Sequence, residues 1–402
     1  MRWRREASEE TMSGTEQNRR IVDFLHVLDD RAVARQVLMR HEQFIRMGHR
    51  PVLICATRDA SAESWIPEGA EVVELGIGRG RTVNALRRLV VALRAIRPDV
   101  LFAQHTGPNR AAILARMIGR IDTPVIVSEC THYSTFGWDH RAIRNRMTAA
   151  LYPHADRVVG VSARVVDDLV AHFPAIAGRT AVIPPAGPDP AALEALCAPV
   201  PDHPWYHDDV RPTLLCSVAN LVPRKGQETL VEALPLIREA AGDVRLVLVG
   251  RPDDEGFVAR LHARAAELGV GDHVWLAGYR DNPFPFLSRS DLFVFASHTE
   301  GCPTVITEAQ ACGVAVVACD CPGGVAEAVE QGKSGVLVPL ERPDSMAEAV
   351  VRVLRDSVLR GELIASGRER ASGTTPRRVA EAHLALAEAC IAERRAGRRR
   401  AG

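Results

Sequence analysis

The sequence predicts an α/β protein with two Rossmann-like domains that face each other across a cleft. The chain has 402 residues, which is too many for one ordinary hydrophobic core. Short apolar runs rich in β-branched residues alternate with longer amphipathic stretches, a pattern typical of parallel sheets covered by helices on both faces. The alternation stops once, in a proline-rich segment, and then starts again. We therefore expect two domains of similar construction.

The first half of the chain contains six apolar runs that we expect to be strands of one sheet. They span residues 21–28, 51–56, 72–75, 100–103, 125–128 and 157–161. Residues 1–20 are polar and lack apolar periodicity, which is typical of a disordered tail. We therefore assign residues 21–187 to the first domain.

A segment in which prolines recur, at positions 188, 190, 199, 201 and 204, predicts an interdomain linker at residues 188–212. Six further apolar runs follow it and predict a second sheet in a domain of residues 213–375. These runs span residues 214–219, 244–250, 274–277, 292–296, 314–318 and 336–339. Residues 376–402 read as a C-terminal helix with a basic tail, since five arginines fall between Glu393 and Arg400.

The composition excludes several classes of protein. Lys plus Arg and Asp plus Glu number 50 each, so the global charge does not favour a nucleic-acid partner. No run of about 20 apolar residues and no signal-type start is evident, and we expect a cytoplasmic protein. The nine cysteines are scattered and lack zinc-knuckle spacing, which favours reduced thiols and predicts no metal site.

The most informative segment runs from residue 297 to residue 308, after an apolar strand and into a helix. Pro303 suits the first helical turn, where its missing NH costs nothing. The amides of Cys302, Thr304 and Val305 are then available, and a helix N-terminus with unpaired NH groups is a natural site for phosphate.

Two glutamates, Glu300 and Glu308, lie in this segment. Their carboxylates are suited to accept hydrogen bonds from the vicinal hydroxyls of a sugar or a ribose. The alternative is that Glu300 caps the helix and Glu308 is a solvated surface residue.

Two cations, Arg224 and Lys225, follow the first strand of the second domain and adjoin a helix start near Gln227. Both suit a diphosphate leaving group, whose negative charge grows as a bond to it breaks. The alternative is a pair of solvated surface charges.

These segments closely resemble the retaining family 4 glycosyltransferases of the GT-B fold over residues 210–350. The most specific elements are Glu300 and Glu308 with Gly301 and Pro303 between them, the Lys225-Gly226 pair, and Gly323-Gly324 followed by Glu327. The runs at 246–250 and 276–279 add to the likeness. The resemblance implies a GT-B enzyme that binds a nucleotide sugar in its C-terminal domain and the acceptor in its N-terminal domain.

The resemblance also implies roles for individual residues. Glu308 would hold the donor ribose, Glu300 would contact the donor sugar hydroxyls, and Lys225 with Arg224 would hold the diphosphate. The donor site would also include Gly301, Cys302, Pro303, Thr304 and Val305, and Gly278 with Tyr279 would line the nucleobase.

The implied reaction retains configuration, with a phosphate oxygen accepting the acceptor's proton, and needs no cofactor or metal. A UDP-sugar is the expected donor and a GDP-sugar the second. Domain closure over the donor would exclude water.

The chain departs from the family in three places. Asn220 stands where members usually carry an arginine, so Arg224 would have to supply the second diphosphate cation. A run from Asp29 to Ala34 replaces a glycine-rich loop, and no phosphate contact is assigned there. The family's catalytic-site histidine falls at Cys130, which makes His132 and Glu129 the nearest polar candidates.

His132 is a candidate catalytic residue, and His105 follows another strand in the same way. The alternative for each is a structural histidine.

Two other functions remain open. A sugar-nucleotide epimerase or a sugar phosphorylase uses a related two-domain fold, and Asn220 leaves room for a catalytically silent sugar-nucleotide-binding protein. The acceptor is a saccharide, a lipid-linked saccharide or a small natural product.

A peripheral contact with the membrane is a further expectation. In residues 82–96, arginines at 87, 88 and 94 alternate with leucines and valines, and Arg81 and Arg97 flank the stretch. This pattern suits anionic lipid. It also suits an ordinary sheet-covering helix with a solvated arginine face.

Overall fold

The computed structural model describes residues 18–77, 82–135, 141–207 and 212–401. They fall into two compact units. Among the described residues, the N-terminal unit comprises those within 18–128, 142–159 and 380–401, and the C-terminal unit comprises those within 129–141 and 160–379. Arg81 lies outside the described residues, as do residues 1–17 of the expected tail.

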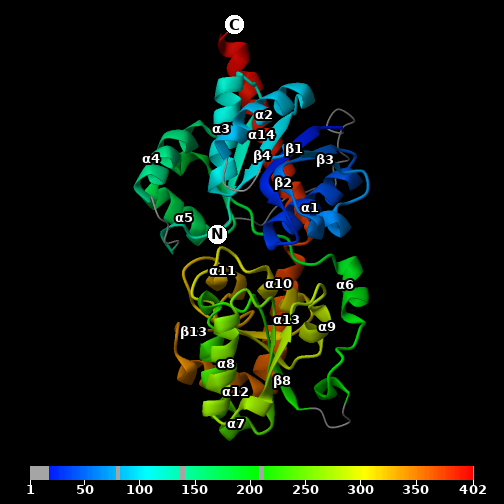
Figure 1. The fold of residues 1–402 in the computed structure, drawn as a ribbon, viewed down its shortest axis with the longest axis vertical. Helices are drawn as coiled ribbons and strands as arrows, with labels where there is room; N and C mark the ends of the chain where they lie inside the picture. The colour runs from blue at the N-terminus through cyan, green and yellow to red at the C-terminus, as the bar shows by residue number, and fades with distance from the viewer. Residues whose placement is uncertain (1–17, 78–81, 136–140, 208–211, 402) are drawn as a thin grey trace. The chain divides into compact units, whose positions relative to one another are not determined.

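The first sheet has seven strands in the order β3-β2-β1-β4-β5-β6-β7, of which β1 to β4 are labelled in Figure 1. The strands are β1 (Arg20–Leu28), β2 (Arg50–Arg58), β3 (Glu71–Glu74), β4 (Val100–Gln104), β5 (Val125–Glu129), β6 (Arg157–Gly160) and β7 (Thr180–Val182). The helices along this part of the chain are α1 (Ala32–Arg46), α2 (Thr82–Ile96), α3 (Thr106–Gly119), α4 (Arg141–Leu151) and α5 (Ala163–His172), of which α5 belongs to the C-terminal unit. The six expected strands are confirmed to within two residues, and β7 was not anticipated because three residues carry no readable periodicity.

The second sheet has six strands in the order β10-β9-β8-β11-β12-β13, each of them expected. They are β8 (Thr213–Val218), β9 (Val244–Val249), β10 (Val274–Gly278), β11 (Leu292–Phe295), β12 (Ala315–Cys319) and β13 (Val336–Val338). The main helices are α7 (Gln227–Ala241), α8 (Glu255–Glu267), α9 (Phe284–Ser288), α10 (Thr304–Ala311), α11 (Val325–Val329), α12 (Pro343–Arg355) and α13 (Ser357–Ser372).

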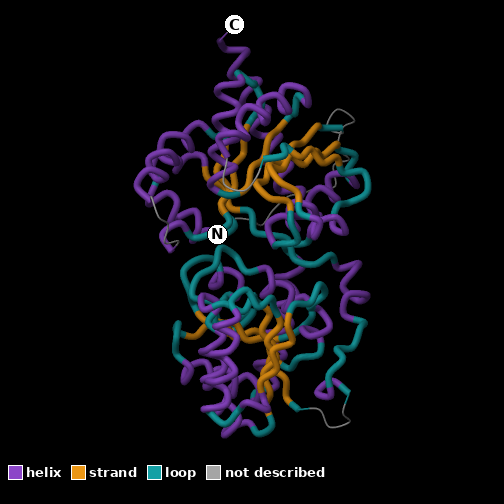
Figure 2. The backbone as a smooth tube through the Cα atoms, viewed as in Figure 1, coloured by secondary structure: helices purple, strands orange, loops and turns teal. Residues whose placement is uncertain are grey.

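Helices cover both faces of this sheet, which explains why its strands are continuously apolar (Figure 2). Successive strand residues serve opposite faces. Leu246 and Leu248 belong to one buried cluster with α7, α8 and α12, and Val247 and Val249 belong to another with residues of α9, α10 and α11. The prediction of two parallel-sheet α/β domains is confirmed.

Each sheet has a point at which the strand order reverses. β1 lies between β2 and β4 in parallel pairs, and β8 lies between β9 and β11 in parallel pairs. In open parallel sheets, ligands bind beyond the carboxyl ends of the strands at such a point. The loops after β8 and β11 therefore define where a ligand site of the C-terminal unit belongs.

The expected linker and the expected basic tail both contain helix. The proline-rich segment holds α6 (Pro190–Cys197), which the Asp189 carboxylate caps at the amide of Ala191. The last helix, α14 (Pro376–Ala401), continues through the basic end that the sequence led us to expect as a frayed tail. Arg394 anchors this end, since its guanidinium lies 2.7 Å from Asp156.

Candidate functional site

The loops that follow β8 and β11 carry the residues that the sequence singled out. After β8 the chain forms a short 3-10 helix, Pro223–Lys225, and then α7 begins at Gln227. After β11 it forms the loop from Ser297 to Pro303 and enters α10. Because β8 and β11 are neighbours at the reversal point, the two loops meet there.

Lys225 and Glu300 form an ion pair between Nζ and Oε1 across these loops, with their side chains 14% and 13% exposed. The Ser297 hydroxyl donates to the same Oε1 at 2.6 Å. Glu300 is therefore neither a helix cap nor a solvated surface residue. Ser297 was not among the predicted site residues, although its place directly after an apolar strand was a usable signal.

Glycines let three loop backbones approach one another at this site. Gly226 has φ +65°, and a Cβ there would lie 2.1 Å from the Ala296 carbonyl oxygen. Gly323 has φ +106°, and a Cβ there would lie 1.5 Å from the Glu300 carbonyl oxygen. The Gly324 amide donates to the Gly301 carbonyl at 2.8 Å. The Gly-Gly motif thus holds the loop after β12 against the loop that carries Glu300.

The helix α10 begins at Thr304, so Pro303 lies at the N-cap, one residue before its expected position in the first turn. No side chain caps this end of the helix. The first amides of α10 are therefore suited to an anionic ligand. Glu308 lies on the second turn as expected. Burial raises the pKa of the Cys302 thiol to about 12, so this thiol stays protonated.

Arg224 is exposed and forms no ion pair with the described residues, while its carbonyl accepts from the His298 amide at 2.9 Å. The side chain of Asn220 forms a hydrogen bond to a different loop, since its amide donates to the Asp253 carboxylate at 2.7 Å. Arg224 is thus the cation beside Lys225 that has no acidic partner.

Gly278 and Tyr279 lie where β10 ends. Gly278 has φ +72°, and its carbonyl accepts from the Gly250 amide at 3.0 Å, which ties the loops after β9 and β10 together. Tyr279 is 36% exposed, and the Cζ atom of Arg251 lies 4.5 Å from the centroid of its ring. A partly exposed aromatic ring at this edge is suited to contact a planar base.

The segment that carries His132 lies against the loop that carries Glu300. The Thr135 and Thr299 hydroxyls are 2.8 Å apart. A Cβ on Gly301 would lie 1.9 Å from the Cys130 carbonyl oxygen. The structure therefore brings the segment of His132 next to Glu300 and its neighbours.

Two other candidates lie nearer to the first sheet. Glu129 closes β5 and is buried. His105 follows β4 with φ +71°, a value unusual for a residue with a side chain.

The motif residue Glu327 makes contacts that the sequence did not predict. Its carboxylate accepts from the amides of Ala163 and Arg164 at 2.7 and 2.8 Å, at the start of α5. The Ser162 hydroxyl donates to the Gly301 carbonyl at 2.9 Å. The start of α5 is therefore bound to the same loops that surround Glu300.

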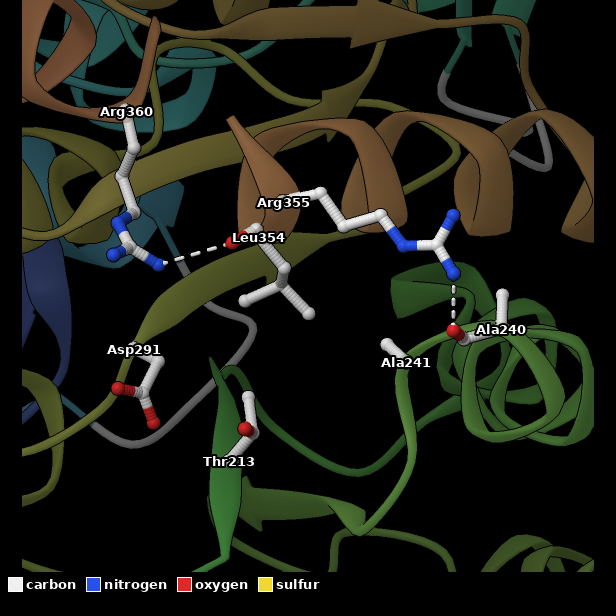
Figure 3. Close-up of a pocket in the computed structure, with 7 residues that line it drawn as sticks. All are labelled: Thr213, Ala240, Ala241, Asp291, Leu354, Arg355 and Arg360. Atoms are coloured by element: carbon white, nitrogen blue, oxygen red, sulfur yellow. Dashed lines mark hydrogen bonds between the residues drawn. The ribbon is translucent and has the colours of Figure 1, made fainter. Parts of the chain in front are cut away.

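A hollow of 270 Å³ lies at the opposite ends of the strands, beside Thr213 and Asp291 (Figure 3). Its two arginines are engaged with helix carbonyls: Arg355 donates to the Ala240 carbonyl, and Arg360 donates to the Leu354 carbonyl at 3.4 Å. This hollow is remote from the residues that the sequence singled out, and we assign it no ligand.

Comparisons with known proteins show the family of the chain. A family model for glycosyl transferases group 1 matches residues 206–370, and a model for glycosyltransferase family 4 matches residues 33–186. The chain is 32% identical to a GDP-mannose-dependent alpha-(1-6)-phosphatidylinositol monomannoside mannosyltransferase of Mycobacterium tuberculosis, over 72% of this chain and 75% of the relative.

Two further proteins are similar over most of the chain. One is the N-acetylgalactosamine-N,N'-diacetylbacillosaminyl-diphospho-undecaprenol 4-alpha-N-acetylgalactosaminyltransferase of Campylobacter jejuni, 27% identical over 65% of this chain and 68% of the relative. Among solved structures, HepE of Anabaena in complex with UDP has a TM-score of 0.76 at 18% identity, covering 92% of this chain and 100% of that chain. This likeness shows the shared fold.

Proposed function

Since the chain belongs to the family 4 glycosyltransferases of the GT-B fold, we propose that it moves a sugar from a nucleotide diphosphate donor to an acceptor hydroxyl with retention of configuration. The observation that carries this proposal is the meeting of Lys225 and Glu300 at the reversal point of the second sheet. There a cation, a carboxylate and an uncapped helix start lie within two adjoining loops.

Each group has a role that its chemistry supports. Lys225 and Arg224 stabilise the charge that grows on the departing diphosphate, together with the amides at the start of α10. Glu300 accepts from donor sugar hydroxyls and Glu308 from the ribose. Donor binding replaces the ion pair of Lys225 with a diphosphate contact and frees Glu300 for the sugar. We propose that no metal or other cofactor takes part.

Two donors follow from different observations. A UDP-sugar is the donor that the family resemblance favours, whereas the relative that is 32% identical is named as GDP-mannose-dependent. The nucleobase contacts at Gly278 run through the backbone and do not discriminate between bases. Both donors therefore belong in the first assay.

We place the acceptor among lipid-linked saccharides, because both relatives named above act on lipid-borne acceptors by their names. No helix within the described parts of the chain has the length and apolar character needed to cross a bilayer. A lipid-linked acceptor therefore calls for contact at the cytoplasmic membrane surface.

Apolar side chains on two packed helices of the N-terminal unit support that contact. Val91 on α2 and Ile118 on α3 are each 62% exposed. The helices adjoin there, since Arg94 of α2 donates to the Gly119 carbonyl at 3.0 Å. Arg87 is exposed on the same helix as Val91. Exposed apolar residues beside arginine are typical of surfaces that bind anionic lipid.

The experiment for the membrane contact is co-sedimentation with anionic vesicles. We expect binding that falls in the Val91→Asp/Ile118→Asp variant but not in Val358→Asp, which changes a 70% exposed residue of α13 in the C-terminal unit. Equal sedimentation of both variants would remove this surface from the proposal.

The experiment for the proposed function combines thermal shift with turnover of UDP-sugars and GDP-mannose. We expect one nucleotide to raise the melting temperature of the wild type, as any ligand of the folded state must. Glu300→Gln and Lys225→Ala should lose most of the sugar transfer, while Lys333→Ala keeps it. Activity should survive a chelator.

Three results would contradict the proposal. Epimerised donor without transfer would favour the epimerase alternative, and binding without any turnover would favour a silent binding protein. If no nucleotide raised the melting temperature, the proposed donor site would be ruled out.

A further inference from the structure

Asp168 on α5 contacts the segment that carries His132 through its side-chain carboxylate. Its carboxylate accepts from the Ser134 amide at 3.0 Å and from the Ser134 hydroxyl. The Asp168 side chain is 6% exposed, and the Nδ1 atom of His132 lies 3.4 Å from its Oδ2. A buried carboxylate needs donors around it, and this one draws them from residues 132–134.

The imidazole of His132 has one nitrogen inside this arrangement. The Nδ1 atom is buried and makes no hydrogen bond of normal geometry with the described residues, and Oδ2 of Asp168 lies 3.4 Å from it. A ring nitrogen that faces a carboxylate carries a hydrogen, because two lone pairs repel. The neutral ring then keeps its lone pair on Nε2.

A second histidine borders the same carboxylate but is already satisfied. The Nδ1 atom of His172 lies 2.8 Å from the Asp168 carbonyl oxygen, which is its closer partner, and 3.4 Å from Oδ1 of the carboxylate. The His172 ring also packs against Tyr133, with 5.5 Å between ring centroids. The Oδ2 atom of Asp168 is therefore left to accept from the Ser134 amide and to face the Nδ1 atom of His132.

The segment that Asp168 holds is in contact with the loop that carries Glu300. Thr135 donates to the His132 carbonyl at 3.0 Å, and its hydroxyl also lies 2.8 Å from the Thr299 hydroxyl. Residues 132–135 thus contact the Asp168 carboxylate through Ser134 and the loop of Glu300 through Thr135.

We infer that Asp168 is a positioning residue that holds His132 in the Nδ1–H tautomer and so presents Nε2 as an acceptor for a sugar hydroxyl. The inference rests on the proposed function for the identity of the ligand. The tautomer itself depends only on the protein. Without Asp168 the proton has no preference for Nδ1, and the ring loses the orientation that a hydrogen bond to sugar requires.

The test is nitrogen NMR of the full chain labelled with 15N-histidine, with the His132→Gln variant used to assign the ring signals. For the neutral ring of the wild type we expect a protonated Nδ1 and an unprotonated Nε2. Asp168→Asn should shift His132 toward the other tautomer. Ser134→Ala is the matched control, since it removes one donor to the same carboxylate and should leave the tautomer unchanged.

Kinetics supply a second measurement. Asp168→Asn and His132→Gln should each lower kcat about 10- to 100-fold with little change in KM for the donor, the range expected when a buried polar group is left without its hydrogen-bond partner. The double variant should be no slower than the worse single variant, because both changes remove one interaction.

The two proposals fail separately. An unchanged His132 tautomer in a folded Asp168→Asn variant overturns the positioning role, even where sugar transfer is observed. A wild type that turns over no nucleotide sugar overturns the proposed function, while the nitrogen spectrum still reports the tautomer.

Discussion

Lys225 and Lys333 are the only lysines among the 50 basic residues of the chain, and their surroundings differ. Lys225 is paired with Glu300 and is 14% exposed, whereas Lys333 is 77% exposed and lies 3.9 Å from Glu330. Arginine fills all the other positions among these 50. A compact ammonium at residue 225 offers a point charge that exchanges partners without the fixed geometry of a guanidinium.

Amine acetylation read by mass spectrometry measures this difference. We expect a saturating nucleotide sugar to slow modification of Lys225, because the diphosphate covers its ammonium, and to leave Lys333 unchanged. Glu300→Gln removes the partner of Lys225 and should speed its modification without donor. Equal labelling of Lys225 with and without donor would argue against its contact with the diphosphate.

Two features of the structure favour glycine at position 323. One is its positive φ angle, and the other is the close Glu300 carbonyl, which leaves no room for a Cβ. Gly323→Ala places a Cβ 1.5 Å from the Glu300 carbonyl oxygen and must displace the loop that carries Glu300. Gly332 is the matched control, because its φ is +75° and nothing lies within 4 Å of a Cβ there. We expect Gly332→Ala to cost about 1 kcal/mol of stability through φ alone. Gly323→Ala should cost more and also abolish the thermal shift produced by nucleotide.

Asp23 is a buried charge whose pKa predicts a pH dependence. Burial alone would raise the pKa of Asp23, but the Arg40 guanidinium and His41 hold it at about 2. Because the folded pKa lies below the unfolded value, the ionised carboxylate stabilises the fold above about pH 4. This stability is lost as the pH falls toward 2.

We expect Asp23→Asn to cost about 3 to 5 kcal/mol at pH 7, because the Arg40 charge is left buried without its partner. Urea unfolding at several pH values measures this cost. The difference between wild type and variant should narrow between pH 4 and pH 2, where the wild-type carboxyl becomes protonated. A constant difference over that range would show that the Asp23 charge is not its cause.

At the scale of elements, the central strands could be predicted because they are buried on both faces and read as continuous apolar runs. Elements without that signal could not be predicted. The strand β7 has three residues, and α6 lies within a run of prolines. The basic end of α14 carries few apolar residues, and partners far away in the sequence hold it as helix.

In the candidate site, the individual residues could be predicted from the sequence but their pairing could not. Glu300, Glu308 and Lys225 could be found from motif spacing, because each lies directly after a strand or on the helix that follows it. The pairing of Lys225 with Glu300 could not, since it joins residues 75 positions apart through the order of the strands. The partner of His132 was hidden for the same reason, because Asp168 lies on a later helix.

The end of α14 tests how such distant partners hold a helix. Arg394 lies 2.7 Å from Asp156 and 3.2 Å from Asp122, whereas Arg395 is exposed. We expect Arg394→Ala to lower the free energy of unfolding by about 1 to 2 kcal/mol, since it removes charged hydrogen bonds that are partly buried. Arg395→Ala should stay within about 0.5 kcal/mol of the wild type. Denaturant melts compare them, and equal losses would mean that the ion pairs do not hold the helix.

At the scale of the whole molecule, the chain contains two sheets with the same kind of reversal point, and only one carries the proposed donor groups. In the first sheet the loops after β1 and β4 present Asp29 and His105. In the second sheet the loops after β8 and β11 present Lys225 and Glu300. The reversal point of the second sheet offers the Lys225 cation, whereas that of the first sheet offers the Asp29 carboxylate. An anionic diphosphate should therefore bind at the second sheet.

Hydrogen exchange read by mass spectrometry locates the nucleotide on this basis. Because a bound diphosphate orders the loops it contacts, we expect nucleotide to slow exchange in residues 220–226 and 298–312. Helix α12, which is distant in sequence from both loops and packs on α7, is the internal control and should not change. The protection should vanish in Lys225→Ala. Protection of residues 29–34 and 105–109 instead would move the donor to the first sheet and reverse the roles proposed for the two units.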